Sequence, residues 1–180
     1  LAHNAYIVSS KAELAKLQAA VMLPDGHAVN PKIVGFSAKY IAELAGIKVP
    51  EETKLLIAEI AGVGADFPLS REKLSPVLAM VKANSTEEGL DLCEAMLDLG
   101  GLGHTAVIHT EDEDLQIQFG IRMKACRILV NTPAAEGGIG NIYNEMLPSL
   151  TLGCGSYGHN SVSHNVSAVD LINVKTLAKR

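Results

Sequence analysis

The sequence is poor in cysteine and aromatic residues. It has no tryptophan, only 4% aromatic residues and three cysteines (Cys93, Cys126 and Cys154) in 180 residues. Three cysteines at such wide spacings form neither a disulfide framework nor a zinc site. We therefore expect free thiols in a reducing, cytoplasmic compartment, and no bound metal.

Long apolar runs and an excess of basic residues are also absent. No run approaches the ~20 apolar residues that a membrane helix needs. Fifteen Lys and Arg against 20 Asp and Glu give a net charge of -5, whereas a nucleic-acid surface needs a basic patch. We expect neither a membrane nor a nucleic acid as partner. The chain starts at Leu1 without a methionine or a signal-peptide pattern, which suggests a processed or truncated chain.

What the sequence does have is apolar content and alternating periodicity. It is 48% hydrophobic, enough for a packed core. Helical and extended patterns alternate, which predicts an α/β fold with a largely parallel sheet and flanking helices. We expect helices at 11–21, 37–45, 85–100 and 111–123, extended segments at 32–35, 54–60, 77–81, 105–109, 127–130 and 170–178, a loop at 62–75, and irregular backbone at 133–158.

Two glycine patterns match dinucleotide-binding loops in their letters alone. Residues 153–158 match G-x-G-x-x-G and residues 101–106 match its alanine variant. That motif needs a strand before the glycines and a helix after them, so that the helix N-terminus meets the pyrophosphate. Neither segment has this context, and we interpret both as loop glycines.

The residue pattern leaves several kinds of function open. Cys93 and Cys126 fit core positions, whereas Cys154 lies between two glycines and is a candidate nucleophile with His104 or His159 as base. A small thiol hydrolase or acyltransferase is therefore one alternative. His104 suits either a proton shuttle or a loop hydrogen bond. By charge alone Glu72 fits a solvated surface residue. A non-catalytic assembly module that associates through the terminal strand is another alternative.

Several longer stretches carry a family resemblance. They occur in a fixed order at residues 72–80 (EKLSPVLAM), 100–105 (GGLGHT), 127–133 (RILVNTP), 137–144 (GGIGNIYN), 148–156 (PSLTLGCGS) and 171–176 (LINVKT). With them the chain resembles the CoA-acylating aldehyde dehydrogenases, above all the C-terminal part of the aldehyde dehydrogenase half of bifunctional aldehyde-alcohol dehydrogenases.

The resemblance implies an aldehyde-dehydrogenase-like catalytic domain that is incomplete without an upstream dinucleotide-binding domain. Residues 1–167 would form part of the catalytic domain. Residues 168–180 would form a C-terminal strand for pairing, so that we expect self-association into a dimer, a higher oligomer or a filament. The nucleophilic cysteine would lie upstream of Leu1, and the chain alone would be inactive.

The resemblance also implies a reaction and its residues. A cysteine thiolate adds to an aldehyde, hydride passes to NAD, and CoA displaces the acyl group. Glu72 would bind the ribose hydroxyls next to the nicotinamide, with Leu74 as a second cofactor contact, and His104 would be an acid/base in the CoA step. The loop of Gly153, Cys154, Gly155 and Ser156 would lie near the substrate pocket, which makes Cys154 a loop residue.

One position departs from the family pattern. The resemblance predicts a second glycine after Gly158, and this chain has His159 there, while Tyr157 takes the place of the family aromatic residue. We expect this change to affect the backbone geometry of the loop.

Overall fold

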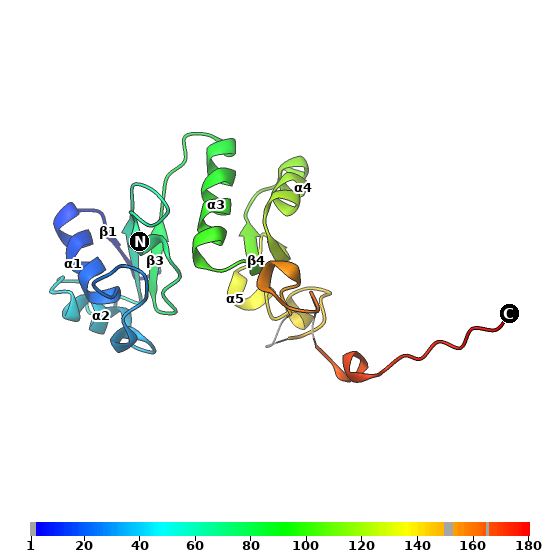
Figure 1. Cartoon of the computed structure of the whole chain (residues 1–180). Helices are drawn as coiled ribbons and strands as arrows, with labels where there is room; N and C mark the ends of the chain where they lie inside the picture. Colours follow the sequence, from blue (N-terminus) through cyan, green and yellow to red (C-terminus); the bar gives the residue numbers. More distant parts are fainter. Residues whose placement is uncertain (1–2, 150–152, 165) are drawn as a thin grey trace. The chain divides into compact units, whose positions relative to one another are not determined.

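The computed structural model describes residues 3–149, 153–164 and 166–180. The chain divides into two compact units, Leu1–Gly100 and Gly101–Arg180, a division that the sequence pattern did not predict. Each unit is a small α/β assembly, and Figure 1 labels most of the helices and strands. Within the described residues, no helix has the length and apolar character needed to cross a membrane.

The first unit contains a three-stranded parallel sheet. Its strands are β1 (Ala5–Val8), β2 (Leu55–Glu59) and β3 (Val77–Met80), in the order β1-β2-β3. Leu56 in the central strand pairs with Tyr6 on one side and with Val77 on the other. The strands expected at 54–60 and 77–81 are confirmed. The four-residue strand β1 was not predicted, because so short a run shows little periodicity.

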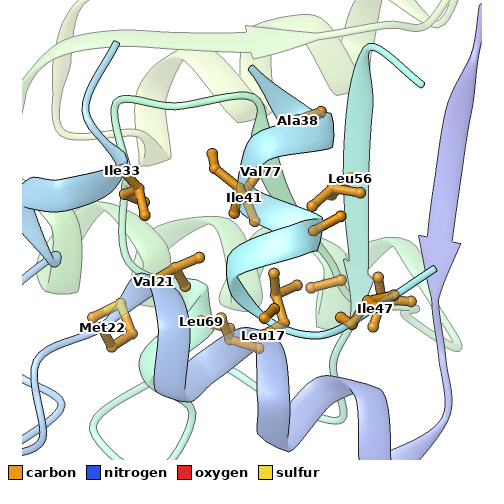
Figure 2. Packing of buried hydrophobic residues seen from close by; sticks show 14 of the residues in the cluster. Leu17, Val21, Met22, Ile33, Ala38, Ile41, Ile47, Leu56, Leu69 and Val77 are labelled. Carbon is orange, nitrogen blue, oxygen red and sulfur yellow. The ribbon is translucent and has the colours of Figure 1, made fainter. Parts of the chain in front are cut away.

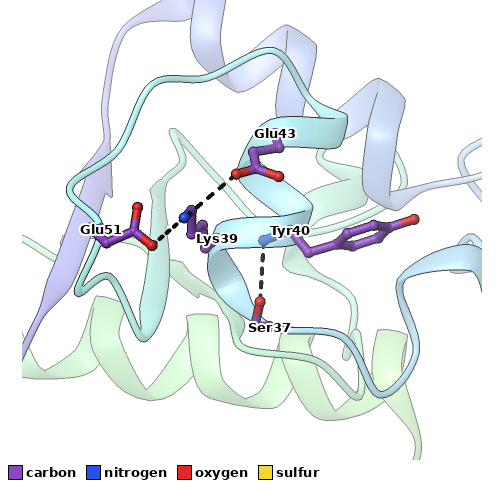
Figure 3. Close-up of polar contacts among 5 residues, drawn as sticks. All are labelled: Ser37, Lys39, Tyr40, Glu43 and Glu51. Atoms are coloured by element: carbon purple, nitrogen blue, oxygen red, sulfur yellow. Dashed lines mark hydrogen bonds and ion pairs between the residues drawn. The ribbon is translucent and has the colours of Figure 1, made fainter.

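The helices of this unit start where the sequence predicts them. They are α1 (Lys11–Val21), α2 (Ala38–Leu44) and α3 (Thr86–Gly100). The Ser37 hydroxyl accepts a hydrogen bond from the Tyr40 amide at 3.2 Å, as an N-cap should (Figure 3). Lys39 lies between Glu43 and Glu51 and pairs with both carboxylates. These ion pairs are largely exposed and contribute little to stability.

A hydrophobic cluster joins α1 and α2 to the sheet. Leu17 and Val21 of α1, Ile41 of α2, Leu56 of β2 and Val77 of β3 are all buried in it (Figure 2). Burying such a side chain completely contributes roughly 1.5–3 kcal/mol relative to leaving it exposed. The amphipathic helix patterns and the parallel strands therefore converge on one core.

In the first unit, one of the predicted extended segments is wrong. Residues 32–35 were expected to be extended, but the structure has a 3-10 turn, η1 (Pro31–Ile33). The Asn30 side chain accepts a hydrogen bond from the Lys32 amide at 3.1 Å, and Pro31 has a φ suited to the first helical position. A capping side chain followed by proline therefore outweighed the short apolar run. The loop expected at 62–75 contains a second such turn, η2 (Pro68–Ser70).

The second unit is built on a β-α-β arrangement. Strands β4 (Gly103–Ile108) and β5 (Ala125–Val130) pair in parallel, and α4 (Glu113–Arg122) connects them. Asp112 accepts a hydrogen bond from the Leu115 amide at 3.0 Å and caps the helix. These elements confirm the predicted helix and both predicted strands. Among the described residues after β5, the structure has the short helix α5 (Ala134–Gly137) and the 3-10 turns η3 (Asn141–Tyr143), η4 (Ser156–Gly158) and η5 (Ala168–Leu171).

The end of the chain differs from the expected strand at 170–178. Residues 168–171 form the turn η5, closed by a capping box between Ser167 and Asp170. Residues 172–180 carry neither helix nor strand. A strand needs a neighbour to accept its backbone hydrogen bonds, and the described part of this chain supplies none to this segment.

Candidate functional site

The two predicted cofactor contacts line one pocket in the first unit. Glu72 and Leu74 border a hollow of about 200 Å³. The Glu72 side chain is exposed, and Leu74 is 73% exposed. The remaining lining residues are His27, Ala28, Val29, Val34, Arg71, Lys73, Leu99 and Gly100. The pocket thus combines one carboxylate with basic and apolar groups.

The turn before β3 sets the positions of these two side chains. Leu69, in η2, is buried in the core and anchors the start of the turn. The Arg71 guanidinium donates a hydrogen bond to the Leu99 carbonyl at 3.2 Å and so ties the turn to the end of α3. Leu74 has a φ of +43°, a conformation that costs of order 1 kcal/mol or more in a residue with a branched side chain. The surrounding contacts therefore hold a strained backbone in place.

Lys73 lies between Glu72 and Leu74 in the sequence, and the sequence pattern did not single it out. It is only 4% exposed, and its ammonium donates hydrogen bonds to the Leu69 carbonyl at 2.5 Å and the Arg71 carbonyl at 2.7 Å. Burial lowers the pKa of Lys73 to about 8, and the nearby charge of Glu72 partly opposes this shift. A lysine in a sequence motif gives no sign of burial, because lysines are mostly exposed.

The remaining predicted site residues come together in the second unit. His104 is an exposed residue of β4, and its Nδ1 lies 2.6 Å from Thr105 Oγ1. A Cβ placed on the preceding residue, Gly103, would lie 2.6 Å from Cys154 Cβ and 2.9 Å from the Cys154 carbonyl oxygen. The 153–158 loop therefore packs directly against the start of β4. Only glycine permits this approach next to His104.

Hydrogen bonds from backbone amides tie the 153–158 loop to residues 160 and 162. The Cys154 amide donates to Asn160 Oδ1, the Gly155 amide to the Val162 carbonyl and the Asn160 amide to the Gly155 carbonyl, each at 2.8 Å. The following element, η4, is a three-residue turn. A helix N-terminus for pyrophosphate is therefore missing after these glycines, in agreement with their interpretation as loop glycines.

The three thiols differ in their surroundings. Cys93 and Cys126, expected in the core, are only half-buried, as is Cys154. A Cβ on Gly155 would lie 3.8 Å from Cys126 Sγ, so the loop also covers this thiol. Burial, followed by the proximity of Cys154, raises the pKa of Cys126. The shift favours the protonated thiol, which is a poor nucleophile.

His159 occupies a backbone position suited to glycine. Its φ of 56° and ψ of 35° are left-handed, and it ends η4. The family pattern predicts glycine at this position. An L-residue in this conformation costs roughly 1–2 kcal/mol, so the departure at this position introduces local strain.

The predicted residues thus form two groups in separate units. Glu72 and Leu74 share the pocket of the first unit, whereas His104 and the 153–156 loop share the start of β4 in the second. Across the described ranges, His, Cys, Asp and Glu side chains nowhere gather in a group of three or more that could hold a metal ion.

Comparison with known proteins finds relatives that match nearly the whole chain, including both groups of predicted residues. The chain is 53% identical over 155 residues, 86% of its length, to an aldehyde-alcohol dehydrogenase of Streptococcus pneumoniae, of which it covers 18%. It is 48% identical over 99% of its length to the bifunctional aldehyde-alcohol dehydrogenase of Escherichia coli, of which it covers 20%. The crystal structure of an acetylating aldehyde dehydrogenase from Geobacillus thermoglucosidasius matches 98% of this chain, and 40% of that one, with a TM-score of 0.85 and 41% identity. The chain is thus similar to aldehyde-alcohol dehydrogenases and to an acetylating aldehyde dehydrogenase.

The chain matches only part of each of these relatives and spans about a fifth of the length of the bifunctional ones. No protein-family model matches it. The structural match confirms the predicted aldehyde-dehydrogenase-like α/β fold.

The contact between Gly103 and the loop can be tested with a matched pair of substitutions. Gly103 and Gly101 both have positive φ, but a Cβ on Gly101 would meet nothing within 4 Å. We expect Gly103→Ala to lower the free energy of unfolding by about 1–3 kcal/mol more than Gly101→Ala, because its methyl group overpacks the loop. Urea denaturation measures this difference. Iodoacetamide should also label Cys154 faster in Gly103→Ala, and equal labelling and stability in the two variants would contradict the packing.

The strain at His159 predicts a stabilising substitution. His159→Gly should raise the free energy of unfolding by about 1 kcal/mol, because glycine adopts the left-handed conformation without a steric penalty. His109→Gly is the control, since His109 is exposed and does not have a positive φ. The control should lose stability through the added freedom of the unfolded chain, and a loss in both variants would argue against strain at His159.

Proposed function

We propose that this chain is part of an NAD-dependent, CoA-acylating aldehyde dehydrogenase, which converts an aldehyde such as acetaldehyde, CoA and NAD to acyl-CoA and NADH. The observation that carries the proposal is the exposed Glu72 carboxylate beside Leu74 at a pocket. This pair belongs to a chain about half identical in sequence to aldehyde-alcohol dehydrogenases.

The pocket residues suit part of a nicotinamide dinucleotide. A volume of about 200 Å³ is smaller than the ~300–1,000 Å³ typical of complete ligand sites, so it fits a ribose-sized fragment. The Glu72 carboxylate can accept hydrogen bonds from two ribose hydroxyls at once, and Leu74 offers an adjacent apolar surface. When bound, the dinucleotide accepts the hydride that the substrate loses.

We assign His104 and the loop to the acyl-transfer side of the reaction. His104 is exposed on β4, and its contact with Thr105 orients the imidazole. A histidine so placed can move a proton at neutral pH, which is the role needed when the CoA thiol attacks. Gly153, Cys154, Gly155 and Ser156 would border the substrate, with Cys154 as a wall residue. The nucleophilic cysteine would lie outside this segment.

A chimera tests the proposal directly. These 180 residues would replace the matching segment of the Escherichia coli relative, and CoA-dependent reduction of NAD by acetaldehyde would be measured. We expect the chimera to be active and the isolated 180-residue chain to be inactive. Glu72→Gln in the chimera should lower kcat/KM for NAD about tenfold, because the charge-assisted hydrogen bonds are lost.

The controls separate a failed fold from a failed function. Glu52→Gln removes an exposed carboxylate away from the pocket and should leave the kinetics unchanged. Alcohol oxidation by the other half of the relative reports whether the chimera is intact. A chimera that oxidises alcohol but has no CoA-dependent aldehyde activity would contradict the proposal.

We further propose that residues 168–180 mediate self-association, and that the enzyme is cytoplasmic, as the absence of disulfides among the described residues suggests. Ile172 and Val174 are 64% and 89% exposed. They alternate with polar residues, so that in an extended conformation they share a face. An unpaired apolar segment of this kind can add as a strand to another subunit.

Substitutions on the two faces of this segment test its pairing. Val174→Lys should shift the 180-residue chain towards monomer, because a buried charge opposes strand addition. Asn173→Lys adds the same charge on the other face and should leave association unchanged. Sedimentation velocity over a range of concentrations measures the difference, and identical behaviour of the two variants would argue against pairing through this face.

A further inference from the structure

Lys73 is the one buried cation of the pocket turn, and the proposed reaction gives it no role. Its neighbours in sequence, Glu72 and Leu74, both face the pocket, whereas its own side chain is 96% buried, given its 4% exposure. Its Nζ contacts the carbonyls two and four residues earlier, Arg71 and Leu69. The side chain therefore folds back under the turn that presents the two cofactor contacts.

We propose that Lys73 is a positioning residue that holds the 69–74 turn closed, so that Glu72 and Leu74 face the cofactor pocket. This inference rests on the proposed function of Glu72. The Lys73 ammonium donates one hydrogen bond to each of two backbone carbonyls of the turn and so ties them together. Without the ammonium these carbonyls would need other donors, because a buried carbonyl is costly to leave unpaired. They also oppose relaxation of the left-handed backbone at Leu74.

The same geometry favours a positioning role for this lysine over a direct chemical role. A buried lysine with a lowered pKa can serve as a base or a nucleophile. Here the Nζ atom donates to the Leu69 and Arg71 carbonyls, and the residue borders the pocket but is only 4% exposed. We therefore assign to Lys73 an action on the reaction through Glu72 and Leu74.

Ionisation of Lys73 should control how firmly the turn is held. Charged donors form stronger hydrogen bonds than neutral ones, and burial brings the pKa of Lys73 down to about 8. The negative charge of Glu72 raises this pKa, and the other titratable or charged groups that line the pocket are His27 and Arg71. As the pH rises above about 8, the ammonium loses its proton and the turn loosens. Binding of the cofactor should then weaken.

The test uses two substitutions at this position in the chimera. Lys73→Met removes the donors and keeps the length of the side chain, whereas Lys73→Arg keeps charged donors that do not titrate below about pH 12. Lys16→Met, on the exposed face of α1, is the matched control. The readouts are hydrogen–deuterium exchange of amides 69–74 without cofactor, and KM for NAD compared with kcat.

Lys73→Met should speed exchange within 69–74 and raise KM for NAD by about tenfold, with kcat changed by less than about twofold. In the unsubstituted chimera, KM should rise between about pH 7 and about pH 9.5. Lys73→Arg should restore most of the affinity and remove that rise. Lys16→Met should match the unsubstituted chimera throughout.

Exchange in the unsubstituted chimera gives a test that needs no variant. After correction for the intrinsic pH dependence, protection of amides 69–74 should fall as the pH passes through about 8. Unchanged protection there and in Lys73→Met would overturn the positioning role. If Glu72→Gln leaves KM unchanged, the proposed function fails by itself, because the exchange result does not depend on cofactor. If Glu72→Gln raises KM but Lys73→Met does not, only the inference about Lys73 fails.

Discussion

Parallel pairing of β3 with β2 is the constraint on which the candidate cofactor site depends. Parallel neighbours cannot be joined by a tight hairpin, so the chain must cross over before the second strand begins. Here the crossover runs through residues 60–76 and contains the turn η2. Leu69 fastens this turn to the core, while Glu72 and Leu74 remain outside it. The hydrophobic core thus decides where the polar site lies.

The same crossover has to satisfy its own backbone groups. It contains a buried stretch outside the strands, and side chains donate hydrogen bonds to several of its backbone carbonyls. Lys73 donates to two of these carbonyls, and Arg71 donates to the end of α3. A charged side chain is buried here because it replaces secondary-structure hydrogen bonds, which offsets part of the cost of its desolvation.

In the second unit, the absence of a side chain at Gly103 sets the position of the candidate site. Gly103 leaves room for the Cys154 backbone beside β4, and this approach carries the 153–158 loop towards His104. Glycine spacing alone suggested a phosphate loop in two places. The element after each set of glycines excludes that interpretation, since residues 103–108 form a strand and residues 156–158 only a turn.

Local signals were enough to predict most elements of the fold. The helix that starts after Ser37 and the one capped by Asp112 follow from side chains that reach amides within three residues. Such signals act over short distances, so the sequence shows them directly. The order of motifs likewise indicated, without any coordinates, the similarity to aldehyde-alcohol dehydrogenases that the comparisons show. The sequence alone therefore determined the α/β class, the helix starts, this resemblance and the choice of Glu72, Leu74 and His104 as candidates.

Only the tertiary structure decided which residues share a site and which are buried. The burial of Lys73, the strain at Leu74 and His159, and the contact of Gly103 with Cys154 all depend on residues brought together from other parts of the chain or on backbone angles set by them. The fate of the apolar segment at 172–180 follows the same rule, because a strand exists only where a neighbour pairs with it. Periodicity records which residues prefer to be buried, but packing between distant segments determines the environment in which each charge and each thiol finally lies.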